Sequence, residues 1–237
     1  MQFGKACGQL SRLLWAGIFT LSCFSHPCPA GEHDMEWWSW VTVSKDLDEF
    51  GFPKEWKLIL DYQHRKNRDA ERLFERKYTF SLQIPVPYSG DWSLAGHYRR
   101  VDQETGPNED RYYFDLERTW KRPCGMEYDL KFRTRFDIRD FDNTEGVTYR
   151  VRPFLDLSRP FPWQIDGRPV RAYTNAEAYW DSAPDLWNRY RLGAGFRIPV
   201  SQQATLTLGY QMEANYIIRT ANWDYDNMIM TGIGFKF

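Results

Sequence analysis

In the segment from Met126 to Arg139, mainly apolar residues alternate with charged residues. One face would carry Met126, Tyr128, Leu130, Phe132, Thr134, Phe136 and Ile138, and the other Glu127, Asp129, Lys131, Arg133, Arg135, Asp137 and Arg139. A period of two is typical of a β-strand with two different faces. Strands of soluble sheets usually have about 5–6 residues, whereas a strand that crosses a bilayer needs about 9–11. This run is long enough to cross a membrane.

The same alternation recurs along the chain, and no segment has a sustained helical period. We count ten clear alternating segments from Trp56 to Phe237, and one more at residues 37–43. Single-chain bacterial barrels close with an even number of strands. The pattern therefore predicts an all-β fold, a closed antiparallel transmembrane β-barrel of 10 or 12 strands.

Composition supports this fold class. Hydrophobic residues make up 42% of the chain and the mean hydropathy is -0.65, which is too polar for a bundle of membrane-spanning helices. Aromatic residues nevertheless reach 17%, with 11 Trp and 14 Tyr, as expected for a barrel with aromatic girdles at both membrane interfaces. A soluble β-sandwich with an aromatic core is the alternative that composition leaves open. The net charge of -1 indicates no basic excess for nucleic acid.

The first thirty residues are typical of a signal peptide. Lys5 and Arg12 precede an apolar run at residues 13–24, which is too short to span a bilayer as a helix. Ala30 offers a cleavage site, whereas the residues before Cys23 fit a lipoprotein site poorly. We expect a signal peptide at residues 1–30, a barrel domain at residues 31–237 and export to the outer membrane of a Gram-negative bacterium.

Three of the four cysteines lie in the segment expected to be removed. Cys124 would then be alone, so no intrachain disulfide is expected. Its neighbours Pro123 and Gly125 indicate a turn rather than a nucleophile.

The connections between the alternating segments fall into two groups. Turns with Pro or Gly lie at residues 85–91, 121–125 and 199–203, and polar links at residues 102–110, 140–146, 181–186 and 218–224. Because outer-membrane barrels have short periplasmic turns and longer outer loops, we assign the first group, and Phe237 with it, to the periplasmic side. The long connection at residues 158–169, with Phe161 and Trp163, does not fit; a short interfacial helix or a tucked-in flap would account for it.

The last segment carries the most specific local motif. Gly232 is followed by the alternating aromatic residues Phe235 and Phe237. This resembles the C-terminal signal that the barrel-assembly machinery recognises, although Met230 stands where a large polar residue is usual. The motif predicts that this machinery is a partner of the chain.

Several motifs of the C-terminal half occur in a familiar order. They are Arg152-Pro153-Phe154, Asn175-Ala176-Glu177-Ala178-Tyr179, Asn188-Arg189-Tyr190-Arg191-Leu192-Gly193-Ala194-Gly195 and Leu208-Gly209-Tyr210. Together with Trp40-Val41-Thr42-Val43 and Trp56-Lys57-Leu58 near the start, the chain resembles the bacterial outer-membrane family catalogued as domain of unknown function 2490. The resemblance implies a closed barrel and brings no catalytic residues with it.

The polar faces of the predicted strands are rich in charge. Candidate lumen-lining residues are Arg99, Lys131, Arg133, Arg135, Arg150, Arg152, Glu177, Arg189, Arg191 and Arg197. Rings of Arg or Lys favour anions in pores, so the charge pattern favours a narrow passive channel for small polar or anionic solutes. The alternative is a network of ion pairs that fills a narrow barrel, giving a plugged structural or envelope-interaction barrel.

An outer-membrane lipid-modifying enzyme is a third hypothesis, which would need a nucleophile and a base. His97 shares its face with Ser93 and Arg99, but no recognisable catalytic motif accompanies it. We therefore expect no enzyme, no catalytic residue, no metal and no cofactor. Arg76 and Arg118 fall on the apolar face near strand ends, where they would extend toward lipid headgroups or lipopolysaccharide.

Overall fold

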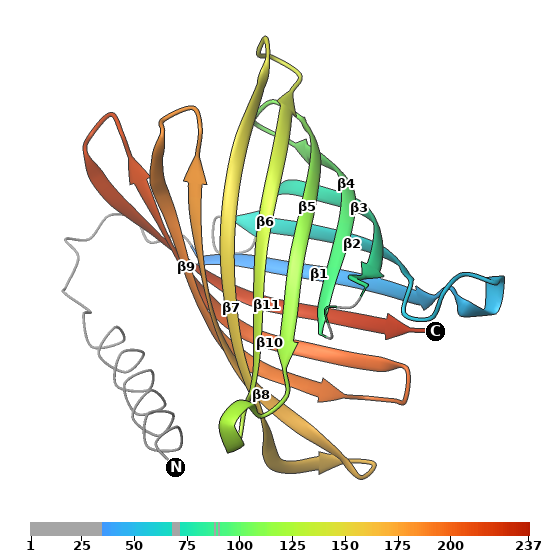
Figure 1. Ribbon diagram of the computed structural model, residues 1–237. Coiled ribbons are helices and arrows are strands. Elements are labelled where there is room, and N and C mark those ends of the chain that lie inside the picture. Colours follow the sequence, from blue (N-terminus) through green and yellow to red (C-terminus); the bar gives the residue numbers. More distant parts are fainter. Residues whose placement is uncertain (1–34, 68–71, 88, 90) are drawn as a thin grey trace.

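The computed structural model describes residues 35–67, 72–87, 89 and 91–237, which form a closed β-barrel (Figure 1). The strands are β1 (Met35–Asp46), β2 (Lys57–Asn67), β3 (Arg72–Pro85), β4 (Trp92–Gln103), β5 (Glu109–Trp120), β6 (Asp129–Phe141), β7 (Val147–Ile165), β8 (Arg168–Asp181), β9 (Leu186–Pro199), β10 (Ala204–Ile217) and β11 (Asn222–Lys236). Two short 3-10 helices, η1 (Asp48–Phe50) and η2 (Pro123–Gly125), lie between strands. The predicted signal peptide, residues 1–30, lies outside the described residues. Among the helices of the described part, none has the length and hydropathy needed to cross a membrane.

The barrel has eleven strands, so the expected number of 10 or 12 is wrong. The segment at residues 37–43 is a full strand of the barrel, β1, and the ten later segments are the other ten. Consecutive strands are antiparallel, but β1 pairs with β11 in parallel, with Trp40 opposite Gly232. The parallel pair is a geometric necessity, because an odd number of strands that alternate in direction leaves the first and last pointing the same way. The barrel is therefore antiparallel everywhere except at this closing pair.

The two faces of the sheet have the polarity that the alternation predicts. Apolar residues on the outer face are exposed, such as Phe80 at 51% and Phe114 at 50%, while charged residues on the inner face are buried, such as Asp137 at 0% and Glu213 at 2%. This arrangement is the reverse of a soluble domain, where charged residues are almost never fully buried unless paired. The sheet closes on itself instead of packing against a second sheet, as a sandwich would.

Aromatic pairs form two belts on the outer face. Toward one rim the pairs join neighbouring strands, as in Tyr62–Tyr78 and Tyr98–Tyr112 with centroids 5.2 and 5.3 Å apart. Toward the other rim, the ring centroids of Trp92 and Trp120 are 6.4 Å apart. Tyr112 and Trp120 are eight residues apart on β5, which corresponds to about 26 Å along the strand at about 3.3 Å per residue.

The connections occupy two rims. The rim where β11 ends, here called the C-terminal rim, carries residues 47–56, 121–128, 166–167 and 200–203, and the opposite rim carries residues 104–108, 142–146, 182–185 and 218–221. The two groups of connections thus lie at opposite ends, as predicted. The expected difference in length is absent from these connections, since the longest of them, residues 47–56, lies at the C-terminal rim.

Residues 158–169 form neither a helix nor a flap. Strands β7 and β8 continue as a hairpin beyond the ends of their neighbours (Figure 1), with a break in register between Pro160 and Gln164. Asp166 and Gly167 turn the chain with φ angles of 48° and 71°, as a two-residue type I′ turn requires. Two alternating segments joined by Asp-Gly predict a β-hairpin. This prediction was missed because Pro160 and Pro162 argue against a strand in this segment.

Candidate functional site

The charged lumen is the candidate functional site. The structure places all ten predicted lumen residues on the inner face of the barrel. Six are buried, namely Arg99, Arg135, Arg150, Arg152, Glu177 and Arg191. The other four, Lys131, Arg133, Arg189 and Arg197, are half-buried.

The lumen cations are held in ion pairs. Arg135 donates two hydrogen bonds to Asp115, at 2.6 and 2.7 Å, and Arg150 binds Asp181 in the same way, at 2.5 and 3.0 Å. Such two-point contacts between guanidinium and carboxylate are the strong form of the interaction. Arg191 pairs with Glu213. The charge of each of these arginines is therefore compensated by a carboxylate on a neighbouring strand.

Other ion pairs skip a strand. Arg133 on β6 donates to Glu177 on β8 at 2.8 Å, and Arg152 on the intervening strand β7 donates to the same carboxylate at 2.9 Å. Arg197 on β9 binds Asp156 on β7 at 2.6 and 3.1 Å. These contacts join the strands through the lumen as well as through the sheet.

A layer of these residues crosses the interior between the two rims. We call it the ion-pair belt, and it consists of Asp115, Arg135, Asp137, Arg152, Glu177, Arg191 and Glu213. The guanidinium of Arg191 also lies 4.8 Å from the ring of Trp38, which belongs to β1 on the other side of β10 and β11. Tyr113 and Tyr179 pack into the same layer and are 2% and 1% exposed. The side chains of this layer are therefore packed against one another in the interior.

Sequence reasoning missed several charged residues of the lumen. Arg65 pairs with Glu36 at 2.5 Å, and Arg111 donates to Glu109 at 2.7 and 2.8 Å. Both pairs are buried. The alternation along β1, β2 and β5 would have been enough to predict that these side chains point inward. The register is irregular after Arg65, which weakens the pattern at that position.

Ser81, His97 and Asp115 come together on three adjacent strands, a grouping that the sequence did not predict. Ser81 Oγ lies 2.6 Å from His97 Nδ1, and His97 Nε2 lies 3.3 Å from Asp115 Oδ2. Three features oppose a catalytic role. Nε2 is not aligned for a hydrogen bond, Asp115 is already held at both oxygens by Arg135, and Ser81 is only 2% exposed. The ring of His97 also stacks on Tyr113 with centroids 4.1 Å apart, as in a packed network.

The remaining predicted residues lie at the rims. Arg76 is close to Glu104 at 3.9 Å. Arg118 lies near Asp91, also at 3.9 Å, and covers the rings of Trp92 and Trp120. Cys124 is an exposed free thiol in η2, away from the lumen.

A cluster at the opposite rim ties β4 to the connection after β6. Arg100 donates two hydrogen bonds to Asp142, at 3.2 and 3.0 Å, and one to Asp110 at 3.1 Å. The hydrogen bonds from Arg100 hold the pKa of Asp142 below its ordinary value. The carboxylate form that the ion pair requires is therefore favoured.

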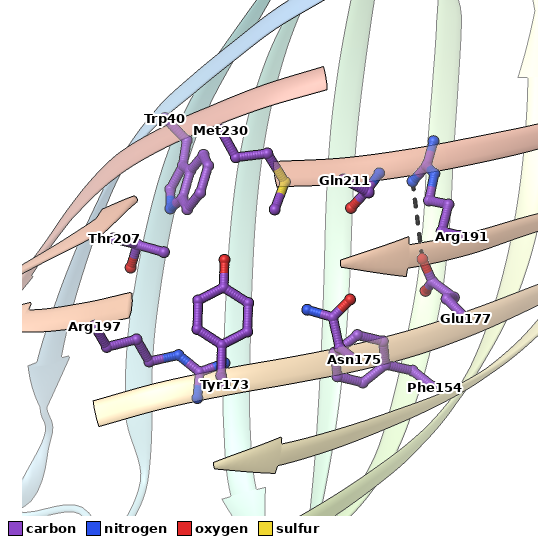
Figure 2. A pocket seen from close by; sticks show the side chains of 10 residues that line it. All are labelled: Trp40, Phe154, Tyr173, Asn175, Glu177, Arg191, Arg197, Thr207, Gln211 and Met230. Atoms are coloured by element: carbon purple, nitrogen blue, oxygen red, sulfur yellow. Dashed lines mark ion pairs between the residues drawn. The ribbon is translucent and has the colours of Figure 1, made fainter. Parts of the chain in front are cut away.

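The lumen also contains a cavity of about 340 Å³ (Figure 2), lined by residues of β1 and β7–β11. It lies beside the ion-pair belt, which contributes Glu177 and Arg191, and extends to Arg197 and Thr207, near the C-terminal rim. The wall there has inward glycines, including Gly195, Gly209 and Gly232. Among the described residues, no cluster of His, Cys, Asp and Glu is arranged to hold a metal ion.

These features define a class of protein: a closed β-barrel with an apolar outer surface and a buried, charged interior. The chain belongs to the family described as "Protein of unknown function (DUF2490)", which it matches over residues 35–226. The family resemblance seen in the sequence is thereby confirmed. No curated protein and no solved structure matches the chain.

Proposed function

We propose that this chain is an integral barrel of the Gram-negative outer membrane whose lumen is closed to free diffusion, and that it serves as a structural or envelope-interaction barrel. The observation that carries the proposal is the ion-pair belt, a layer of buried ion pairs inside a barrel with an apolar exterior. Outer-membrane lipid and lipopolysaccharide are its surroundings.

The outer face supports a membrane location. Exposed apolar patches on soluble monomers rarely exceed a few hundred Å², whereas here large exposed apolar side chains occur on ten of the eleven strands. Outer-membrane barrels carry an apolar band about 25 Å tall between aromatic girdles. The belts at Tyr112 and Trp120 are about 20 Å apart along the barrel axis if β5 has the usual tilt of about 35–45°.

The export route is part of the proposal. The predicted signal peptide would bring the chain to the periplasm. Gly232 and Phe235 on β11, with Phe237 directly after it, would present the recognition motif to the barrel-assembly machinery. Phe235 and Phe237 stack with centroids 6.4 Å apart, so the motif offers one aromatic surface.

The exposure of the charged side chains supports a closed lumen. The side chains of Asp137 and Glu213 in the belt are 0% and 3% exposed, whereas those of Lys131 and Arg197, nearer the C-terminal rim, are 37% and 34% exposed. A solute that crossed the belt would have to separate buried ion pairs. Breaking one such pair leaves an uncompensated buried charge, which costs about 3–5 kcal/mol.

A narrow passive channel for small polar or anionic solutes is the second candidate. The partial exposure of Lys131, Arg189 and Arg197 favours it, because these cations would attract anions into the lumen. The two candidates differ in whether the belt opens.

Conductance in a planar lipid bilayer tests the proposal. The purified barrel is expected to be electrically silent over a range of voltages. A variant that removes a pair of the belt, Arg152→Ala with Glu177→Ala, is expected to conduct. Its current would show that the barrel inserts into the bilayer under the conditions in which the unaltered protein is silent. Steady anion-selective currents from the unaltered protein would overturn the closed lumen in favour of the channel.

We also infer that the protein is not an enzyme. Ser81 is buried, so His97 has no nucleophile beside it that a substrate could reach. Both oxygens of Asp115 are already bound by Arg135, so Asp115 is not free to orient His97. Labelling of Ser81 by a serine-reactive fluorophosphonate would contradict this inference.

A further inference from the structure

The cavity beside the ion-pair belt has the chemistry of a binding site. Its volume, about 340 Å³, lies at the lower end of the range of about 300–1,000 Å³ that is usual for small-molecule sites. Figure 2 shows side chains from several strands converging on it.

Glycine backbone leaves room for two aromatic side chains that line the cavity. An added Cβ at Gly232 would lie 1.9 Å from the ring of Trp40, and one at Gly209 would lie 2.3 Å from the hydroxyl of Tyr173. The two aromatic side chains therefore lie close against glycine backbone on one side, and both line the cavity. Trp40 offers a flat apolar surface to an occupant, whereas the guanidinium of Arg197 lies over the ring of Tyr173, 4.4 Å from its centroid.

Four uncharged side chains of the cavity have polar groups that are available to an occupant. Within the described part of the chain, the hydroxyls of Tyr173 and Thr207 and the side-chain amide of Asn175 form no hydrogen bond. Gln211 has only a long contact, 3.6 Å, from its Nε2 to the sulfur of Met228. These four groups can donate and accept hydrogen bonds with an occupant.

The charged groups of the cavity, by contrast, are already engaged. Arg197 is held by Asp156 at two points, and Arg191 by Glu213. The positive charge of each arginine is therefore already compensated by a carboxylate. The cavity offers an anion no uncompensated cation, although it contains arginines.

We propose that this cavity binds a small neutral polyhydroxylated molecule, a sugar of mono- or disaccharide size. Its hydroxyl groups would bond to Tyr173, Asn175, Thr207 and Gln211, and its apolar C–H face would pack on Trp40. The binding site goes beyond the proposed function and holds whether or not the belt opens.

Calorimetric titration of the purified barrel tests this site. The probes are glucose, N-acetylglucosamine and maltose, with glucose 6-phosphate as the anionic counterpart. A zwitterionic detergent is required, because detergents with sugar headgroups would compete. At least one neutral sugar is expected to saturate the protein, and glucose 6-phosphate is expected to bind no more tightly than glucose. Saturation by none of the neutral sugars, or tighter binding of the phosphate, overturns the proposal.

The variant Tyr173→Phe separates binding from folding. It removes only a hydroxyl that has no partner in the protein, so the unfolding midpoint is expected to stay unchanged. The Kd for the sugar is expected to rise roughly fivefold, the value of one neutral hydrogen bond. Tyr210→Phe is the matched control, since that hydroxyl lies on the outer face and bonds Asn227; it leaves the Kd unchanged. Equal Kd values for Tyr173→Phe and the unaltered protein overturn the proposed contact.

Discussion

Arg135 shows how the barrel keeps charged side chains in its interior. Its guanidinium binds Asp115 at two points and lies 4.0 Å from the ring of Tyr113. The side chains of Arg135 and Asp115 are 8% and 7% exposed. A buried pair of this kind adds little net stability compared with apolar residues, but the loss of one partner is costly, because the other charge stays buried without compensation.

Arg135→Ala is therefore expected to lower the free energy of unfolding by about 3–5 kcal/mol. Lys131→Ala is the matched control. Lys131 lies on the same strand and face and pairs with Glu117 at 2.7 Å, but its side chain is 37% exposed. Its loss is expected to cost about 0–1 kcal/mol. Urea titration of the two variants in detergent micelles measures the difference, and equal effects would show that the belt is accessible to water.

At the scale of elements, the parallel pair β1–β11 is the feature that closes the barrel. Ten registered pairs, from Met35 opposite Asn227 to Ser44 opposite Lys236, hold the two strands together. On the inner face, Trp40 lies directly against Gly232. The large residue of one strand thus occupies the space that the missing side chain of the other leaves free.

Gly232→Ala is expected to destabilise this closing pair. The new Cβ would lie 1.9 Å from Cε2 of Trp40, and overpacking of this kind usually costs about 1–3 kcal/mol. Gly234→Ala is the control on the same strand and face, where the nearest atom to an added Cβ is 4.0 Å away. Because glycine inside a strand is itself unfavourable by roughly 0.5–1 kcal/mol, this control is expected to be neutral or stabilising. Refolding into detergent micelles followed by urea unfolding compares them, and a neutral Gly232→Ala would mean that Trp40 moves freely.

At the scale of the whole molecule, the main feature is that the polarity of the two faces is the reverse of that in a soluble domain. The charged interior compensates its own charges, so the outer face decides where the barrel is stable. Phe114 lies on that face between the two aromatic belts and is 50% exposed.

Phe114→Arg tests the environment of the outer face. In phospholipid vesicles the change is expected to cost about 2–4 kcal/mol, the value for arginine at the bilayer midplane. Phe50→Arg serves as the control, because Phe50 lies in η1 at the C-terminal rim and is 67% exposed; about 0–1 kcal/mol is expected there. Denaturant titration of both variants in vesicles measures these values. If Phe114→Arg is neutral in vesicles, the outer face does not contact hydrocarbon.

The order of residues along the chain is enough to specify the strands, their two faces and the fold class. Alternation is a local property, because a strand places successive side chains on opposite sides whatever its neighbours are. For this reason Arg135, Arg152 and Glu177 could be assigned to the inner face without knowledge of the pairing, and Phe114 to the outer face.

Other features depend on how the strands meet. The number of strands, the parallel closure of β1 on β11, the hairpin of β7 and β8, the grouping of Ser81 with His97 and the cavity beside Trp40 came only from the tertiary structure. Each depends on register and closure, which bring together residues far apart in sequence, as Trp40 and Gly232 are. Whether a lumen arginine attracts a solute or neutralises a carboxylate two strands away is likewise decided by this geometry, because the charge of an isolated strand carries no information about its partner.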